Sequence, residues 1–192
     1  MEKFLFLDGS LCPCRVGSIG QNGEMVELEA VDKPLSGFFY AVEELFRRQK
    51  ISWDDISAFL VSAGPGNLTG LRSAKMFVDT ALAIRMGRPV YAFCGLELGA
   101  QWICESQQLK NFSLLAPISK QRSAIISVTN GTVGKIHHGK TDEFAAAGPL
   151  FAMGTGFAAP TQLRATPPPM EFIAKKLAEM QPAKTFEPIT FH

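Results

Sequence analysis

Short apolar runs alternate with turn residues over the first thirty positions of the chain. Residues 3–7 (KFLFL) are mostly apolar and end in the turn signal Asp8-Gly9-Ser10. Two further runs, residues 15–19 and 25–31, flank Asn22-Gly23, and Asn-Gly is the strongest short hairpin signal. The pattern therefore predicts three antiparallel strands in a meander.

Helical spacing of the apolar residues follows. In residues 35–50, Phe38, Ala41, Val42 and Leu45 recur at intervals of three, one and three, which places them on one face of a helix. The next predicted elements are a capped turn at residues 52–55, a buried strand at 58–62, a glycine loop at 64–67, a helix at 69–86, a strand at 89–93 and a helix at 96–107.

The second half of the chain repeats part of this order. Strands are predicted at residues 113–118, 124–128, 132–136 and 150–153, followed by a helix at 170–180 and a last strand at 187–191. The repeated meander predicts an α/β chain of two related lobes, residues 1–108 and residues 109–192, with the second lobe shortened. A single α+β domain is the alternative.

The glycine loop is a candidate phosphate-binding site. Gly64, Gly66 and Gly70 let backbone N–H groups approach an anion closely, and the loop with Asn67 leads into a helix N-terminus, for which Thr69 is a good cap. Strand-to-helix glycine loops are often only tight turns, and the Lys-Ser/Thr ending of a P-loop is missing. Both interpretations stay open at this point.

The helix at residues 69–86 has more than one apolar side. One face can pack on a sheet, while Met76, Thr80 and Ala83 occupy another, and soft or small residues suit close helix–helix contact. The pattern favours a partner interface over a helix buried wholly within the chain. The predicted interface residues are Phe38, Val42, Arg72, Ser73, Met76, Phe77, Thr80 and Ala83.

Composition changes this picture in two respects. The 192 residues carry a formal net charge of +1 without a basic stripe, so most phosphate contacts to any RNA would come from a partner. Four cysteines without a Cys-x-x-Cys pair, no signal peptide and no apolar run of about 20 residues favour a reduced, cytoplasmic protein without a membrane span.

The sequence predicts neither catalytic residues nor a metal site. His137 and His138 are adjacent, and adjacent strand positions point to opposite faces, which makes a poor ligand pair. Asp8 could hold a metal–nucleotide complex, although capping the turn after the first strand is the simpler role.

One run of residues resembles a known family. Residues 64–72, Gly-Pro-Gly-Asn-Leu-Thr-Gly-Leu-Arg, resemble the glycine signature of the TsaB (YeaZ) family, which acts with TsaD and TsaE in forming threonylcarbamoyladenosine in tRNA. Residues 51–56, 87–90 and 95–97 also resemble family segments, Asp8 occupies the family's position after the first strand, and residues 154–156 and 187–188 resemble later ones. The likeness covers nearly the whole chain and is clearer in the first half.

The resemblance implies a two-lobed actin-like ATPase fold of the ribonuclease-H type. It also implies that the two helices at residues 35–50 and 69–86 pack against a TsaD-like protein in a heterodimer, with a TsaE-like ATPase as a further partner and tRNA contacted indirectly. ATP or ADP with magnesium at the partner interface is the cofactor it allows. The family's loop histidine before the first helix has no counterpart near Pro34 and Leu35.

The leading hypothesis is a non-catalytic scaffold of TsaD in threonylcarbamoylation of adenosine 37 of tRNA. One alternative is a small actin-like ATPase or phosphotransferase that uses Asp8 and the loop from Gly64 to Gly70. Another is a homodimeric, non-enzymatic relic that pairs through the same helix face.

Overall fold

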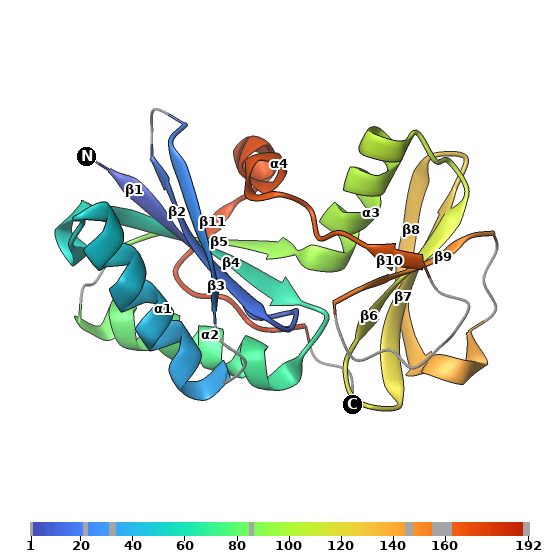
Figure 1. Cartoon of the computed structure of the whole chain (residues 1–192), viewed down its shortest axis with the longest axis horizontal. Coiled ribbons are helices and arrows are strands. Elements are labelled where there is room, and N and C mark those ends of the chain that lie inside the picture. Colours follow the sequence, from blue (N-terminus) through green and yellow to red (C-terminus); the bar gives the residue numbers. More distant parts are fainter. Residues whose placement is uncertain are drawn as a thin grey trace.

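Two β-sheets lie side by side in the computed structural model, each with helices against it (Figure 1). The structure describes residues 2–20, 23–30, 34–84, 87–144, 148–154 and 163–189. Of the residues on which predictions rest, 22, 31, 85–86, 155–156 and 190–191 lie outside the described residues.

The first sheet begins with the predicted meander. Its strands are β1 (Lys3–Asp8), β2 (Cys14–Gly20), β3 (Met25–Ala30), β4 (Ile56–Gly64), β5 (Val90–Cys94) and β11 (Pro182–Ala183). The spatial order is β11-β5-β4-β1-β2-β3. β1 pairs antiparallel with β2 and parallel with β4, and β4 pairs parallel with β5.

The second sheet repeats the arrangement of the first. Its strands are β6 (Phe112–Pro117), β7 (Arg122–Thr129), β8 (Thr132–Lys140), β9 (Leu150–Met153) and β10 (Leu163–Ala165). The order β8-β7-β6-β9-β10 corresponds strand by strand to β3-β2-β1-β4-β5, with the same parallel and antiparallel pairings. The predicted α/β fold of two related lobes is confirmed, and the single α+β domain is not supported.

Two helices cover one face of the first sheet. α1 (Pro34–Gln49) and α2 (Leu68–Ile84) lie side by side against it (Figure 1). Alternation along β1 explains the division of the core, because Leu5 and Leu7 pack with these helices while Phe6 packs on the opposite face with α4 (Met170–Lys175). The 3-10 turn η1 (Trp53–Asp55) between α1 and β4 has the predicted cap, in which Ser52 and Asp55 exchange hydrogen bonds.

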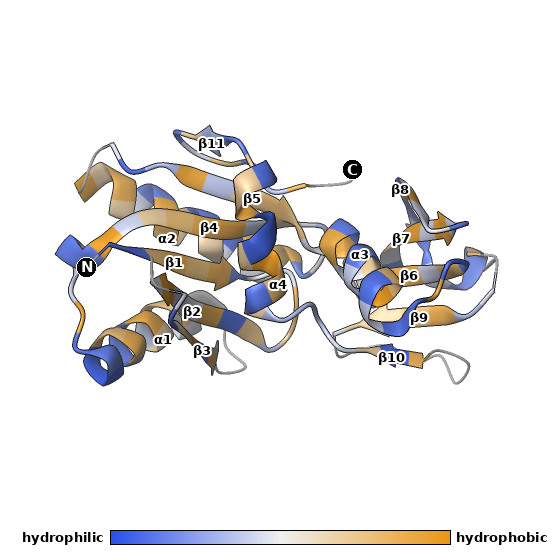
Figure 2. Ribbon diagram, turned by 90° about the horizontal axis from the view of Figure 1, so that it is seen from above, coloured by the Kyte–Doolittle hydropathy of each residue, from blue (hydrophilic) through white to orange (hydrophobic). Residues whose placement is uncertain are grey.

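α3 (Gly95–Gln107) joins the two lobes and lies between the sheets (Figure 2). Leu96, Ala100 and Ile103 pack in the core of the second sheet, whereas Leu98 packs with Phe6 of the first. The helix therefore packs against both lobes.

The second lobe is shorter than the first in its connections. Between β8 and β9 the described residues form only the 3-10 turn η2 (Thr141–Glu143), where the first lobe has α1. α4 and β11, which the sequence assigns to the second lobe, lie against the first sheet. The lobe boundary at residue 108 stays a prediction.

The C-terminal elements differ from their predicted form. The helix predicted at residues 170–180 is α-helical only to Lys175 and continues as the 3-10 turn η3 (Lys176–Glu179). A strand at residues 187–191 is wrong for residues 187–189, and residues 190–191 lie outside the described part. Pro182 and Ala183 form the added strand instead, because they reach the free edge of β5.

Candidate docking surface and glycine-motif site

Large apolar side chains are exposed on the outer side of α1 and α2. Phe39 and Tyr40 on α1 are 44% and 68% exposed, and Met76 and Ile84 on α2 are 47% and 75% exposed. Thr80 and Ala83 are also exposed, and positions 76, 80, 83 and 84 fall on one helix face. We call Phe39, Met76, Thr80, Ala83 and Ile84 the apolar strip.

A hollow of about 190 Å³ opens within the apolar strip. Its walls are Phe39, Trp53, Phe77, Thr80, Ala81 and Ile84. The ring of Phe77 lies 5.0 Å from that of Phe39 and 5.9 Å from that of Trp53, distances at which aromatic rings attract one another. The hollow therefore has an aromatic floor that is held in place, which makes it a candidate binding site for an apolar group.

A second hollow of about 450 Å³ lies beside the first, and Thr80 lines both. Its polar side includes Lys75, whose Nζ lies 2.9 Å from Asp79 Oδ2 and 3.4 Å from Glu187 Oε1. The hydrogen bond that Lys75 donates to Asp79 raises the pKa of Lys75 above its usual value. Phe186 is buried in the first core, so the segment after β11 is fastened along α2.

The structure divides the predicted interface residues into two groups. Arg72, Met76, Thr80 and Ala83 are exposed. Phe38, Val42, Ser73 and Phe77 are buried.

The buried group corrects the predicted interface. Phe38, Val42 and Phe77 pack in the first core against β1 and β4, and the Ser73 hydroxyl donates to the Thr69 carbonyl at 2.8 Å. Only Phe77 reaches the surface hollow, as part of its floor. The predicted interface does not include Phe39, Trp53 and Ile84, which line the hollow. Phe39 follows Phe38 by one helical step of about 100°, at the edge of the apolar face, and this spacing is the signal that could have found it.

The glycine motif is packed against the turn that follows β1. A Cβ atom on Gly66 would lie 2.1 Å from Ser10 O, and one on Gly70 would lie 2.2 Å from Gly9 O. The Asn67 N–H donates to Ser10 O at 2.7 Å. These glycines are needed because two backbone segments touch, which no side chain would allow.

Four of the five loop residues predicted for phosphate binding donate their backbone N–H to acceptors within the chain. The Asn67 side-chain oxygen accepts from the N–H groups of Thr69 at 3.2 Å and Gly70 at 3.4 Å, and the Leu71 N–H donates to the Asn67 carbonyl. The cap of α2 is thus Asn67 instead of Thr69, because the helix begins at Leu68. The Gly64 N–H donates to the Ser62 hydroxyl at 3.3 Å. The loop is arranged as a tight turn in which these four N–H groups are not directed at a phosphate.

Asp8 is buried and takes part in hydrogen bonds and an ion pair. Its Oδ1 accepts from the Ser10 N–H at 3.0 Å and from the Ser10 hydroxyl at 2.6 Å, which is the predicted capping of the turn. Its Oδ2 lies 3.7 Å from Arg15 Nη1. A carboxylate beside a buried guanidinium does not fit a magnesium–nucleotide complex, since the two cations would repel.

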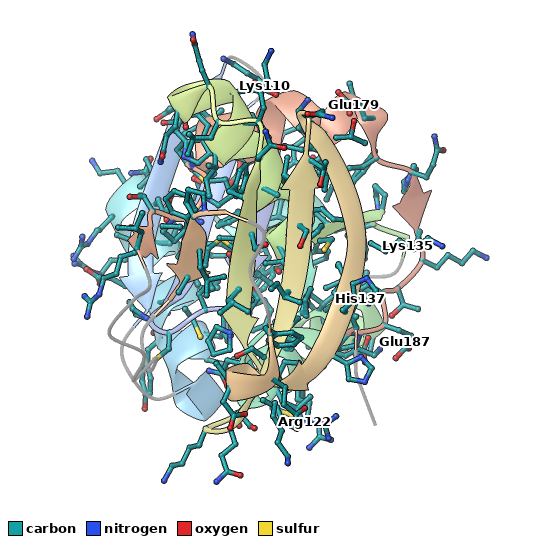
Figure 3. The ribbon with its side chains drawn as sticks, turned by 90° about the vertical axis from the view of Figure 1, so that its right-hand side faces the viewer. Lys110, Arg122, Lys135, His137, Glu179 and Glu187 are labelled. Carbon is teal, nitrogen blue, oxygen red and sulfur yellow. The ribbon has the colours of Figure 1, made fainter. Side chains whose placement is uncertain are left out.

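Other candidate chemistry does not come together in the described residues. Within them, no group of three or more His, Cys, Asp or Glu side chains could hold a metal ion. Figure 3 shows Lys110, Arg122, Lys135 and His137 spread around the second sheet without forming one basic patch. Burial raises the pKa of the Cys14 and Cys94 thiols to about 12. No helix in the part of the chain described here could cross a membrane.

Comparisons with known proteins agree with this architecture. A family model described as "TsaD: tRNA N6-adenosine threonylcarbamoyltransferase" matches residues 38–188, and the chain belongs to this family. YeaZ from Pseudomonas aeruginosa has the same fold over 100% of both chains, with a TM-score of 0.71 and 20% identity.

A second solved structure, from the same organism and described as similar to the peptidase YeaZ, has a TM-score of 0.73 at 19% identity over the whole of both chains. The search of curated proteins found no match. The predicted resemblance to the TsaB (YeaZ) family is confirmed in the fold.

Proposed function

We propose that this chain is a non-catalytic partner of a TsaD-like protein in threonylcarbamoylation of adenosine 37 of tRNA. Membership of the TsaD family and the YeaZ fold support a role in this tRNA modification. In this proposal the apolar strip binds the partner, a TsaE-like ATPase joins the complex, and tRNA is contacted mainly through the partner. The protein then acts in the cytoplasm, where tRNA is modified.

The position of the exposed apolar residues carries the proposal. Five large apolar side chains are exposed among the described residues, and four of them, Phe39, Tyr40, Met76 and Ile84, lie on α1 and α2. A concentration of this kind on one side of a protein is typical of a protein–protein interface. A helical partner surface would shield these side chains from water and fill the hollow beside Phe77.

The geometry of the glycine motif supports the non-catalytic part of the proposal. An ATPase or phosphotransferase needs donors directed at phosphate oxygens and a carboxylate free for magnesium. Here Asn67 accepts the N–H groups at the start of α2, and Asp8 is paired with Ser10 and Arg15. The contribution of the chain would be to stabilise the active conformation of its partner.

Depletion of the protein from cells tests this function. We expect the threonylcarbamoyladenosine content of tRNA, measured by mass spectrometry of nucleosides, to fall on depletion and to recover with the wild-type chain. Met76→Arg should fail to restore it, because a charge would be buried in the interface. Leu163→Arg is the matched control, since Leu163 is a similarly exposed residue on β10 in the other lobe.

Two results would contradict the proposal. One is an unchanged nucleoside content after depletion. The other is full recovery with Met76→Arg, which would show that the apolar strip is not needed. A homodimer formed through the strip is a further outcome that would oppose the heterodimer, and light scattering of the purified chain detects it.

A further inference from the structure

The side chains of Asp8 and Arg15 form a buried charge pair at the end of the first sheet. The two residues are directly opposite each other on β1 and β2, so their side chains lie on the same face of the sheet. Both residues are more than nine-tenths buried. The separation of 3.7 Å between Asp8 Oδ2 and Arg15 Nη1 makes this an ion pair shielded from water.

Further groups fix the guanidinium of Arg15 in this position. Its Nη2 donates to Glu27 Oε2 at 3.1 Å, and its Cζ lies 5.3 Å from the centroid of the Phe6 ring. Burial alone would lower the pKa of Arg15, but the hydrogen bond to Glu27 and the charge of Asp8, with a weaker effect of Glu171, raise it above its ordinary value. Arg15 therefore stays charged and is held on several sides.

The Nη1 atom of Arg15 is buried without a hydrogen-bond partner, and Asp8 Oδ2 lies 3.7 Å from it. The other oxygen of that carboxylate is taken up by Ser10. A second cation brought to Asp8 would meet a fixed positive charge and would have to displace these contacts.

We propose that Arg15 is the resident cation of the Asp8 site and excludes magnesium–nucleotide from it. The guanidinium neutralises the carboxylate that an actin-like ATPase would use for its metal. Asp8 then has a structural role: it holds the turn at Ser10, whose carbonyl accepts the Asn67 N–H of the glycine motif at 2.7 Å. This inference does not depend on the partner protein, so the binding of a TsaD-like partner can stand if the exclusion fails.

Binding of magnesium–ATP and of Mn²⁺ to the purified full chain tests the exclusion. We expect no saturable binding of magnesium–ATP by calorimetry up to about 1 mM, a weak limit on the scale of protein–ligand affinities, and no bound Mn²⁺ by electron paramagnetic resonance. Saturable binding of either by the wild type, lost in Asp8→Asn, would overturn the proposal.

A double-mutant cycle in urea tests the structural role. Asp8→Asn and Arg15→Met should each raise the unfolding equilibrium constant, and their combination should deviate from additivity by about tenfold or more, as expected for a buried pair. Glu44→Gln with Arg47→Met, an exposed ion pair on α1, should deviate by about threefold or less. Additive effects at Asp8 and Arg15 would contradict the proposal. If Arg15→Met does not fold, Arg15→Gln, which also removes the charge, takes its place in the cycle.

Discussion

The ring of Phe39 on α1 lies 5.0 Å from the ring of Phe77 on α2, with an angle of 59° between their planes. Phe77 is buried in the first core, whereas Phe39 is nearly half exposed. The pair thus connects the interior of the first lobe with the apolar strip. It supplies a rigid aromatic surface on which a partner helix can be placed at little cost in side-chain entropy.

Replacing Phe39 tests how much of the binding energy this surface provides. We expect Phe39→Ala to weaken binding of a TsaD-like partner by about 2 kcal/mol, or roughly 30-fold, because aromatic residues at interface centres are frequent hot spots. The stability of the isolated chain should fall by only about 1–2 kcal/mol, less than for a fully buried Phe. Calorimetric titration and urea unfolding measure the two effects.

Leu163→Ala provides the comparison for Phe39→Ala, since it removes an exposed apolar side chain from β10. The affinity of the Leu163→Ala variant for the partner should equal that of the wild type. Equal losses for both variants would indicate that general hydrophobicity, and not the apolar strip, governs association.

Gly66 is expected to be intolerant of any side chain. A Cβ atom there would come within 2.1 Å of the Ser10 carbonyl oxygen, so Gly66→Ala must separate the glycine motif from the turn after β1. We expect a loss of about 3 kcal/mol in the free energy of unfolding, at the upper end for overpacking. Denaturant unfolding followed by circular dichroism measures it.

Gly139→Ala is the control for Gly66→Ala, because its nearest neighbouring atom would be 3.5 Å away, an ordinary contact. Its effect should stay within about 0.5 kcal/mol. A Gly66→Ala variant as stable as Gly139→Ala would mean that the two loops do not touch as described.

The buried thiols give a prediction about pH. Burial raises the pKa of Cys14 and Cys94 to about 12, so at pH 8 the thiolate fraction is on the order of 10⁻⁴, roughly 1000-fold below that of an exposed thiol. We expect iodoacetamide to label both residues very slowly in the native protein and readily in urea, as read by peptide mass spectrometry.

The same shifts predict a loss of stability in alkali. Because each pKa is higher in the folded state, the unfolded chain loses these protons first. The protonated thiols of Cys14 and Cys94 contribute fully to the free energy of unfolding below pH 9, the ordinary pKa of a thiol. This contribution declines as the pH rises towards about 12. Native labelling of Cys14 as fast as labelling in urea would contradict this account.

Local patterns in the sequence were sufficient to predict the helices and strands of the first lobe. The meander, α1, β4, α2 and β5 follow from runs of apolar residues and from turn signals such as Asn22-Gly23, which act over a few residues. The repeated strand order was also visible, as a second meander. The exposed positions Met76, Thr80 and Ala83 follow from helical spacing on α2.

The parts that could not be predicted depend on how segments meet in space. Phe38 and Phe39 are adjacent and equally apolar. Helical spacing puts Phe38 on the apolar face and Phe39 at its edge, but the packing of α1 on the sheet and α2 decides that Phe38 is buried and Phe39 nearly half exposed. The pairing of Asp8 with Arg15 depends on the strand register of β1 and β2. The turn between the two strands sets this register, and the sequence pattern does not determine the length of that turn.

The capping of α2 shows the same limit on a smaller scale. Asn67 and Thr69 are both good caps by composition, and a shift of the helix start by two residues decides between them. Because Asn67 accepts two N–H groups that the sequence made available to phosphate, this small difference changes the interpretation of the loop.

Association of the purified chain with a purified TsaD-like protein, followed by size-exclusion chromatography with light scattering, tests the central claim most directly. The account predicts a 1:1 complex with the wild type and with Leu163→Arg, and separate proteins with Met76→Arg. Formation of the same complex by Met76→Arg, or no complex with the wild type, would contradict it.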